Sequence, residues 1–88
     1  MKYDQFLSLR ILPVIIDSEK TAWLLGIHQD AVAILVRAGH LEPLENPPPG
    51  AQRYFSSRYV LQLGEDVQWM RKAVRIIRQH YRARNAKE

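Results

Sequence analysis

The sequence has 88 residues, of which 47% are hydrophobic and 25% charged, and its formal net charge is +4. These values argue against wholesale disorder, and the length allows one small domain whose core is too modest for a large internal active site. There is no cysteine, which excludes disulfide bonds and cysteine-based metal sites.

No apolar run approaches the roughly 20 residues that a membrane-spanning helix needs. The longest near the start, residues 11–16, is interrupted by Pro13. The first four residues lack the basic start and the cleavage site of a secretory signal. We therefore expect a cytoplasmic protein without a membrane partner.

The basic excess lies at one end of the chain. Residues 1–63 carry six basic and six acidic side chains, whereas residues 64–88 carry seven basic and three acidic ones, so the excess there is 7 − 3 = +4. A basic surface favours an anionic partner, and the C-terminal segment is where its charge is expected to act.

The first expected unit is an N-terminal arm, residues 1–17, that is either a short helix or extended. Pro13 ends any helix in it. Ser18 is expected to cap a helix from Glu19 to about Leu25, with Glu19 favouring the helix dipole. The side chains expected to face the core from this helix are Ala22, Trp23 and Leu25.

The stretch from Thr21 to Leu41 predicts two short helices joined by a tight turn. Gly26 ends the first helix and Gly39 the second, because glycine adopts the left-handed conformation without cost. Ile27 fills the turn, and His28 takes the N-cap position of the second helix.

The second helix has an apolar face and a more polar outer face. The spacing of Val32, Leu35 and Val36 predicts the buried face. The residues expected on its other faces are Gln29, Asp30, Ala33 and Arg37, with Ile34 partly exposed.

A β-hairpin is expected next, with one strand over residues 40–44 and its return over residues 52–55. Between them three consecutive prolines (47–49) hold the loop in an extended, polyproline-like form, and Gly50 turns it. Such a hairpin directly after two helices is a wing. Ser56 or Ser57 then caps a short helix over residues 58–63.

A long helix is expected from Glu65-Asp66 to about Asn85, with two apolar stripes. The first stripe repeats every three to four residues like a coiled-coil seam: Val67, Met70, Val74, Ile77 and Tyr81. The second consists of Trp69, Ala73, Ile76 and His80. One small domain rarely needs both stripes, so the second is expected to form a homodimer interface, or else to be covered by the N-terminal arm.

From Ser18 to about Leu63 the pattern resembles the winged helix-turn-helix of MerR-like regulators and phage excisionases. The residues that carry the likeness are Ala22, Leu24-Leu25-Gly26, the apolar helix ending in Gly39-His40-Leu41, and Arg53-Tyr54-Phe55-Ser56. The segment from Asp66 to Asn85 also looks like small bacterial helix-turn-helix proteins. The resemblance implies DNA binding through the second helix and the wing, and dimerisation through the C-terminal helix.

On the second helix, Gln29 can pair with adenine, Ala33 or Ile34 can contact a thymine methyl, and Arg37 is the one cation. Asp30 either accepts from cytosine or, with Gln29, merely starts the helix.

Phosphate contacts are expected from the wing and its surroundings, where Arg53 has the alternative of pairing with Glu42 or Glu45. The candidates are Lys20, Gln52, Arg53 and Arg58. On the long helix, Arg71, Lys72, Arg75 and Arg78 form either a second electrostatic contact or simply its solvated face.

Nothing in the sequence suggests catalysis. The three histidines lie in different segments without metal-ligand spacing, and there is no glycine-rich phosphate loop or nucleophile–base pair. We expect neither an enzyme nor a cofactor.

The expected fold is mainly α with a small β-hairpin wing, a winged helix-turn-helix followed by a long C-terminal helix. The leading hypothesis is a small, dimeric, bacterial-type DNA-binding protein, either a transcriptional regulator or an excisionase-like factor, that binds double-stranded DNA. The alternative is a protein-interaction module on the same scaffold.

Overall fold

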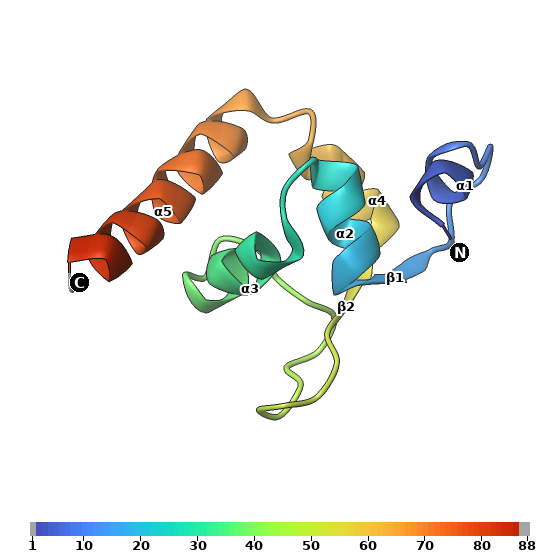
Figure 1. Cartoon of the computed structure of the whole chain (residues 1–88). Coiled ribbons are helices and arrows are strands. Elements are labelled where there is room, and N and C mark those ends of the chain that lie inside the picture. The colour runs from blue at the N-terminus through green and yellow to red at the C-terminus, as the bar shows by residue number, and fades with distance from the viewer. Residues whose placement is uncertain (1, 87–88) are drawn as a thin grey trace.

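The computed structural model describes residues 2–86 and is mainly helical, with one small two-stranded sheet (Figure 1). In chain order the elements are α1 (Tyr3–Leu7), β1 (Ile15–Asp17), α2 (Ser18–Leu25), α3 (Gln29–Arg37), β2 (Tyr54–Ser56), α4 (Ser57–Leu63) and α5 (Val67–Ala86). α2 lies between α1 and α3, and α5 packs on α3 and runs along the edge of the molecule. None of the described helices is both long and apolar enough to cross a membrane.

The core forms where α2, α3 and α4 meet the sheet and α1. Its largest fully buried side chains are Phe6, Phe55, Ile16, Leu35, Leu41, Val32 and Val60. The prediction that Val32 and Leu35 face the core is confirmed, and Val36 is half-buried. The prediction that Ile34 is partly exposed is wrong, since only 6% of it is exposed. α3 packs against both α2 and α5, so more of its circumference is covered than one apolar face would require.

The ends of α2 and α3 are fixed by local hydrogen bonds. Asp17, not the predicted Ser18, caps α2: its carboxylate accepts from the Lys20 amide at 2.9 Å. Gly26, with φ of 72°, ends α2 as predicted. His28 caps α3 as predicted, because its Nδ1 accepts from the Asp30 amide at 3.1 Å.

The sheet differs from the predicted hairpin. β2 pairs antiparallel with β1, and Ile16 lies opposite Phe55. Both of these side chains are buried in the core, and their burial stabilises this long-range pairing. Residues 40–44 form no strand in the described chain; one hydrogen bond, from the Leu44 amide to the Tyr54 carbonyl at 2.8 Å, links them to β2. Residues 42–53 therefore form a long loop, which hangs below α3 in Figure 1.

The two C-terminal helices begin at side-chain caps. Ser56 Oγ accepts from the Tyr59 amide at 3.2 Å, so Ser56 rather than Ser57 caps α4. Asp66 Oδ1 accepts from the Trp69 amide at 3.1 Å at the start of α5. Both starts were expected from the sequence.

The α5 stripe that packs on the rest of the chain is the one predicted for dimerisation. The Trp69 indole N–H donates to the His40 carbonyl at 2.8 Å, and the two rings stack with centroids 4.7 Å apart. Ala73 is buried, Ile76 is half-buried against the core, and His80 is exposed. The chain itself buries Ala73 and partly covers Trp69 and Ile76, so the homodimer interface expected on this stripe stays a prediction. The N-terminal arm does not cover these residues, since α1 packs on α2 and α5 packs on α3.

Candidate nucleic-acid interface

The outer face of α3 carries a short row of side chains. Gln29, Ala33 and Arg37 are four residues apart and therefore lie on one face of the helix. Gln29 and Arg37 are exposed and Ala33 is half-buried. Asp30 lies beside this row and is also exposed. The row can present one amide, one methyl group and one guanidinium to a flat or grooved partner.

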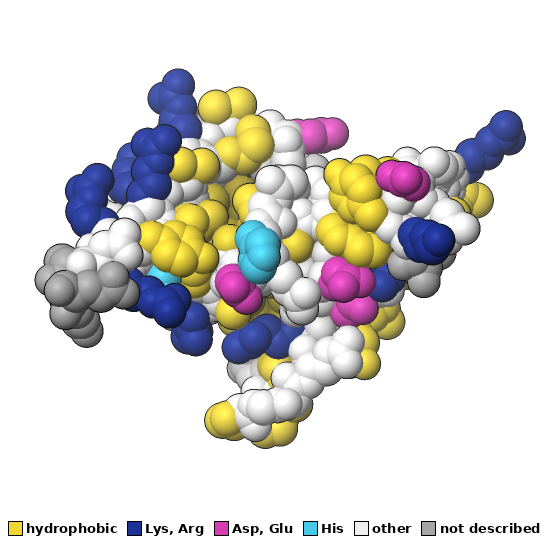
Figure 2. All heavy atoms as spheres, in the orientation of Figure 1, with side chains coloured by type: hydrophobic (Ala, Val, Ile, Leu, Met, Phe, Trp, Pro, Cys, Tyr) yellow, Lys and Arg dark blue, Asp and Glu magenta, His cyan; other side chains and the backbone are white. Residues whose placement is uncertain are grey.

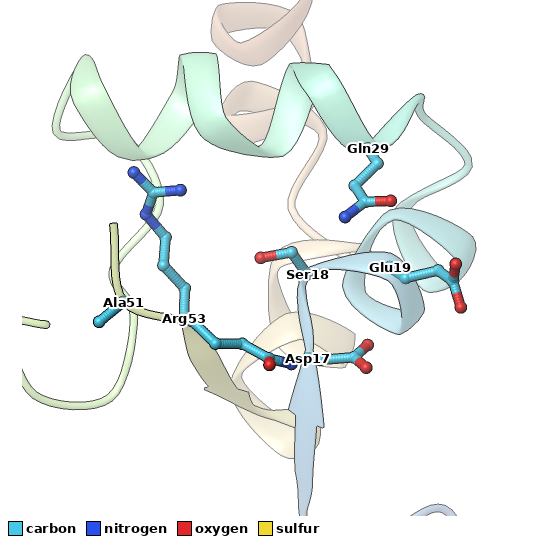
Figure 3. Close-up of a pocket in the computed structure, with 7 residues that line it drawn as sticks. Asp17, Ser18, Glu19, Gln29, Ala51 and Arg53 are labelled. Atoms are coloured by element: carbon cyan, nitrogen blue, oxygen red, sulfur yellow. The ribbon is translucent and has the colours of Figure 1, made fainter. Parts of the chain in front are cut away.

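A hollow of about 320 Å³ lies beside the first turn of α3. Its lining comes from the β1–α2 junction, α3 and the loop: Asp17, Ser18, Glu19, Gln29, Ala51, Gln52 and Arg53. In Figure 3 the Gln29 side chain projects from α3 into this space, while the Arg53 guanidinium reaches toward α3. The structure thus brings Gln29, Gln52 and Arg53 together, as the DNA-binding hypothesis requires.

Arg53 has no ion-pair partner among residues 2–86. The alternative in which it pairs with Glu42 or Glu45 is therefore not formed. Its side chain is only partly exposed, and its guanidinium, which reaches toward α3 in Figure 3, is not paired with a carboxylate among residues 2–86.

Lys20 is already engaged within the chain. Its ammonium lies 3.4 Å from the Asp17 carboxylate and 3.9 Å from that of Glu19. It also sits 5.3 Å from the centroid of the Trp23 ring. A DNA phosphate would have to compete with two carboxylates for this ammonium group. Lys20 is therefore a poor candidate for a contact to the DNA backbone.

Arg58 lies apart from the hollow. It is exposed on α4 and lines a groove with residues of the N-terminal segment, including Leu7, Leu9 and Arg10. None of these residues lines the hollow beside α3. The structure therefore does not bring Arg58 together with Arg53.

The remaining predicted cations gather on α5. Arg71, Lys72, Arg75 and Arg78 are all exposed, and Lys and Arg side chains crowd along this helix in Figure 2. Arg71, Arg75 and Arg78 line one shallow hollow together with Arg82 and Val74. We call these four arginines (71, 75, 78 and 82) the arginine ridge. No residue of the ridge is ion-paired within the part of the chain that the structure describes.

Two parts of this surface were not foreseen. The residues of the β1–α2 junction line the hollow because β1 pairs with β2. The predicted hairpin did not include β1, so it did not place this junction beside residues 51–53. The first stripe of α5 was recognised as apolar, but its exposure was not: Val67, Met70, Val74 and Tyr81 remain at the surface. The missing information in both cases was which long-range partner each segment has.

Within residues 2–86 there is no group of three or more histidine, aspartate or glutamate side chains that could hold a metal ion. Every buried polar side-chain atom in this range has a hydrogen-bond partner. No known protein family, curated protein or solved structure matches the chain.

Proposed function

We propose that the protein binds double-stranded DNA as a winged helix-turn-helix, with α3 in the major groove and the loop over residues 42–53 against the DNA backbone. The observation that carries this proposal is the row of Gln29, Ala33 and Arg37 on the outer face of α3, with Arg53 directed toward the same helix. Two helices joined by a tight glycine turn are a common way to present a second helix to the major groove.

Each member of the row has a chemical role. The Gln29 amide can donate to and accept from an adenine edge, and the Ala33 methyl can contact a thymine methyl. Arg37 is close enough to the end of α3 to reach either a guanine or a phosphate. Arg53 supplies a phosphate contact, which fixes the register of the helix but carries no sequence information.

The acidic side chains near the first turn of α3 restrict where the DNA backbone can run. Asp30 lies 3.5 Å from His28 Nδ1, and Asp17 and Glu19 flank the hollow. Phosphates are therefore expected to approach Arg37 and Arg53 rather than the acidic end, where Asp30 is left to accept from a cytosine amino group.

The test is a fluorescence anisotropy titration of the full chain with a labelled duplex at several salt concentrations. The duplex is first selected from a randomised pool. Arg37→Ala and Arg53→Ala should each weaken binding and lower the slope of log K against log salt by about 1, because each removes one phosphate or base-edge cation. Gln29→Ala should relax the preference at one base pair, at a cost of about 1–3 kcal/mol.

Matched controls come from cations away from α3. Arg10→Ala and Arg58→Ala remove the same charge from the groove between the N-terminal segment and α4, and they should leave the salt slope unchanged. The proposal fails if the unmodified chain shows no affinity even at low salt, or if the control variants weaken binding as much as Arg37→Ala.

A further inference from the structure

The exposed surface of α5 combines an apolar stripe with a basic one. The apolar stripe consists of Val67, Met70, Val74, Ile77 and Tyr81, four of which are 37–55% exposed while Ile77 is half-buried. On a helix these positions repeat at three and four residues and so form a continuous line. From Val67 to Tyr81 the line is about 21 Å long at 1.5 Å per residue. Ile77 packs against the core, whereas Val67, Met70, Val74 and Tyr81 remain exposed in the described chain.

The arginine ridge runs beside the apolar stripe. By helix geometry, Arg71, Arg78 and Arg82 follow one flank of the stripe, while its other flank adjoins the residues that pack on α3. Stripe and ridge line shared hollows, one of which is formed by Ile77, Arg78, Tyr81, Arg82 and Asn85. From Val67 to Ala86 the sequence has six Lys and Arg residues and no Asp or Glu.

We propose that this face of α5 docks an acidic amphipathic helix of a partner protein. The aliphatic side of such a helix would cover Met70, Val74 and Ile77, and its carboxylates would pair with the arginine ridge. Arginine is suited to this role because its planar guanidinium binds carboxylates bidentately. A partner of about four turns matches the length of the stripe. This is a helix-in-groove mode of recognition in which apolar anchors supply affinity and charge supplies selectivity.

Other occupants fit the surface less well. Duplex DNA would satisfy the ridge but leave the apolar stripe in water, because phosphates offer it no apolar surface. Helices that lie in membranes carry bulky Trp, Phe or Leu residues on the apolar face, whereas this stripe is formed mainly by valine, methionine and isoleucine. A second copy would bring its own six cations and no anion from α5, so like charges would meet along the flanks.

The test uses the full chain and three labelled peptides followed by fluorescence anisotropy. The first is a designed helix with leucines at i, i+3, i+4 and i+7 flanked by glutamates; the second replaces each glutamate by lysine; the third scrambles the first. The acidic helix should bind, and the lysine version and the scrambled peptide should bind at least about tenfold more weakly, a difference of roughly 1.4 kcal/mol. If the scrambled peptide bound as tightly as the acidic helix, binding would depend on charge alone and not on the apolar stripe. That result would overturn the proposal.

Two variants separate the stripe from the ridge. Val74→Glu should weaken the acidic peptide about tenfold by placing a carboxylate in the apolar contact, and Arg78→Glu should weaken it while improving binding of the lysine peptide. The matched controls are Val14→Glu and Arg10→Glu, which make the same changes at exposed positions of the N-terminal segment. Circular dichroism verifies that each variant is folded, which is expected because Val74 and Arg78 are both exposed.

Three further outcomes would assign the surface to another occupant and overturn the proposal. They are a dimer in sedimentation equilibrium that Val74→Glu dissociates, capture by vesicles of equimolar phosphatidylcholine and phosphatidylserine without peptide binding, and displacement of the peptide by duplex DNA at equal charge concentration. Peptide binding by α5 can be tested separately from DNA binding by α3. Arg37→Ala should weaken DNA binding and leave peptide binding unchanged.

Discussion

The pair α2–α3 and the helix α5 use similar residues in opposite ways. In α2 and α3 the aliphatic side chains of Val32, Ile34 and Leu35 are buried, and Lys20 is paired with Asp17 and Glu19. In α5 an apolar stripe is exposed, and the arginines beside it have no ion-pair partner in the described chain. Buried aliphatic side chains contribute to the core, whereas an exposed apolar stripe beside unpaired cations is a surface that a partner can bind. The shape suited to reading DNA and the strongest positive charge thus lie on different helices.

The largest expected effect is a difference in the free energy of unfolding between alanine substitutions of one aliphatic residue from each region. Leu35 is fully buried in α3, so Leu35→Ala should lower the free energy of unfolding by about 2–5 kcal/mol through lost burial and the cavity left behind. Val74 is 46% exposed on α5, and Val74→Ala should change it by less than about 0.5 kcal/mol. Urea denaturation followed by circular dichroism measures both.

A large cost at Val74 would break the comparison. It would mean that the stripe is covered in solution, and sedimentation at the same protein concentration would show whether a second copy covers it. In that case the loss on Val74→Ala should grow as the protein concentration rises, because oligomerisation stabilises by mass action.

Sequence reasoning was most successful where structure is set by neighbouring residues. The start of α3 was predicted at His28, that of α4 at Ser56 or Ser57, and that of α5 at Glu65-Asp66. In the structure His28, Ser56 and Asp66 each accept a hydrogen bond from the first turn of the helix. The end of α2 was read from Gly26. The cap of α2 was misplaced by one residue, because Asp17 and Ser18 are both good N-cap residues. Asp17 is the last residue of β1, and α2 begins directly after it.

The larger failures concern partners that are distant in the sequence. The segment ending at Asp17 pairs with Tyr54–Ser56, and no local pattern distinguishes this pairing from a hairpin across the proline loop. The two stripes of α5 have equally good helical spacing. Which one faces the core depends on the contact between Trp69 and His40, which joins residues far apart in the chain. The sequence predicted which Lys and Arg residues are candidates for DNA contacts. Which of them lie close together depends on the long-range pairing of β1 with β2 and of α5 with the core.

An effect of intermediate size compares the glycines at the two junctions. Gly26, between α2 and α3, has φ of 72°, whereas Gly64, between α4 and α5, has φ of −66°. Gly26→Ala should lower the free energy of unfolding by about 1–2 kcal/mol, since a side chain is strained in the left-handed region. At Gly64 an added Cβ would lie 3.4 Å from the Leu61 carbonyl oxygen, an ordinary contact. Gly64→Ala should therefore be neutral or stabilising by up to about 1 kcal/mol.

Thermal and urea unfolding of the two alanine variants measures the difference. Equal costs at both positions would contradict a left-handed residue at the α2–α3 turn, and with it the tight reversal on which the proposed DNA-reading geometry depends.

The smallest expected effect concerns how firmly α5 is joined to α3. Trp69→Phe keeps an aromatic ring against His40 but removes the indole N–H that donates to the His40 carbonyl. The control is Trp23→Phe, which makes the same change at a ring that contacts Tyr3 and Phe6 edge to face and whose indole nitrogen donates no hydrogen bond in the described chain. Trp69→Phe should cost about 1 kcal/mol more than the control, the net worth of one hydrogen bond.

Native-state hydrogen exchange shows where that loss falls. With Trp69→Phe, amides in the first half of α5 should lose protection before those of α2 and α3, because the clamp at His40 holds that end of α5 against the core. With Trp23→Phe the loss should fall on α1 and α2, since Trp23 packs on Phe6. If Trp69→Phe instead lowers protection evenly across the chain, α5 unfolds only together with the core. The two regions would then differ in the surfaces they expose but not in stability, and the exposed face of α5 would be presented to a partner from a rigid support.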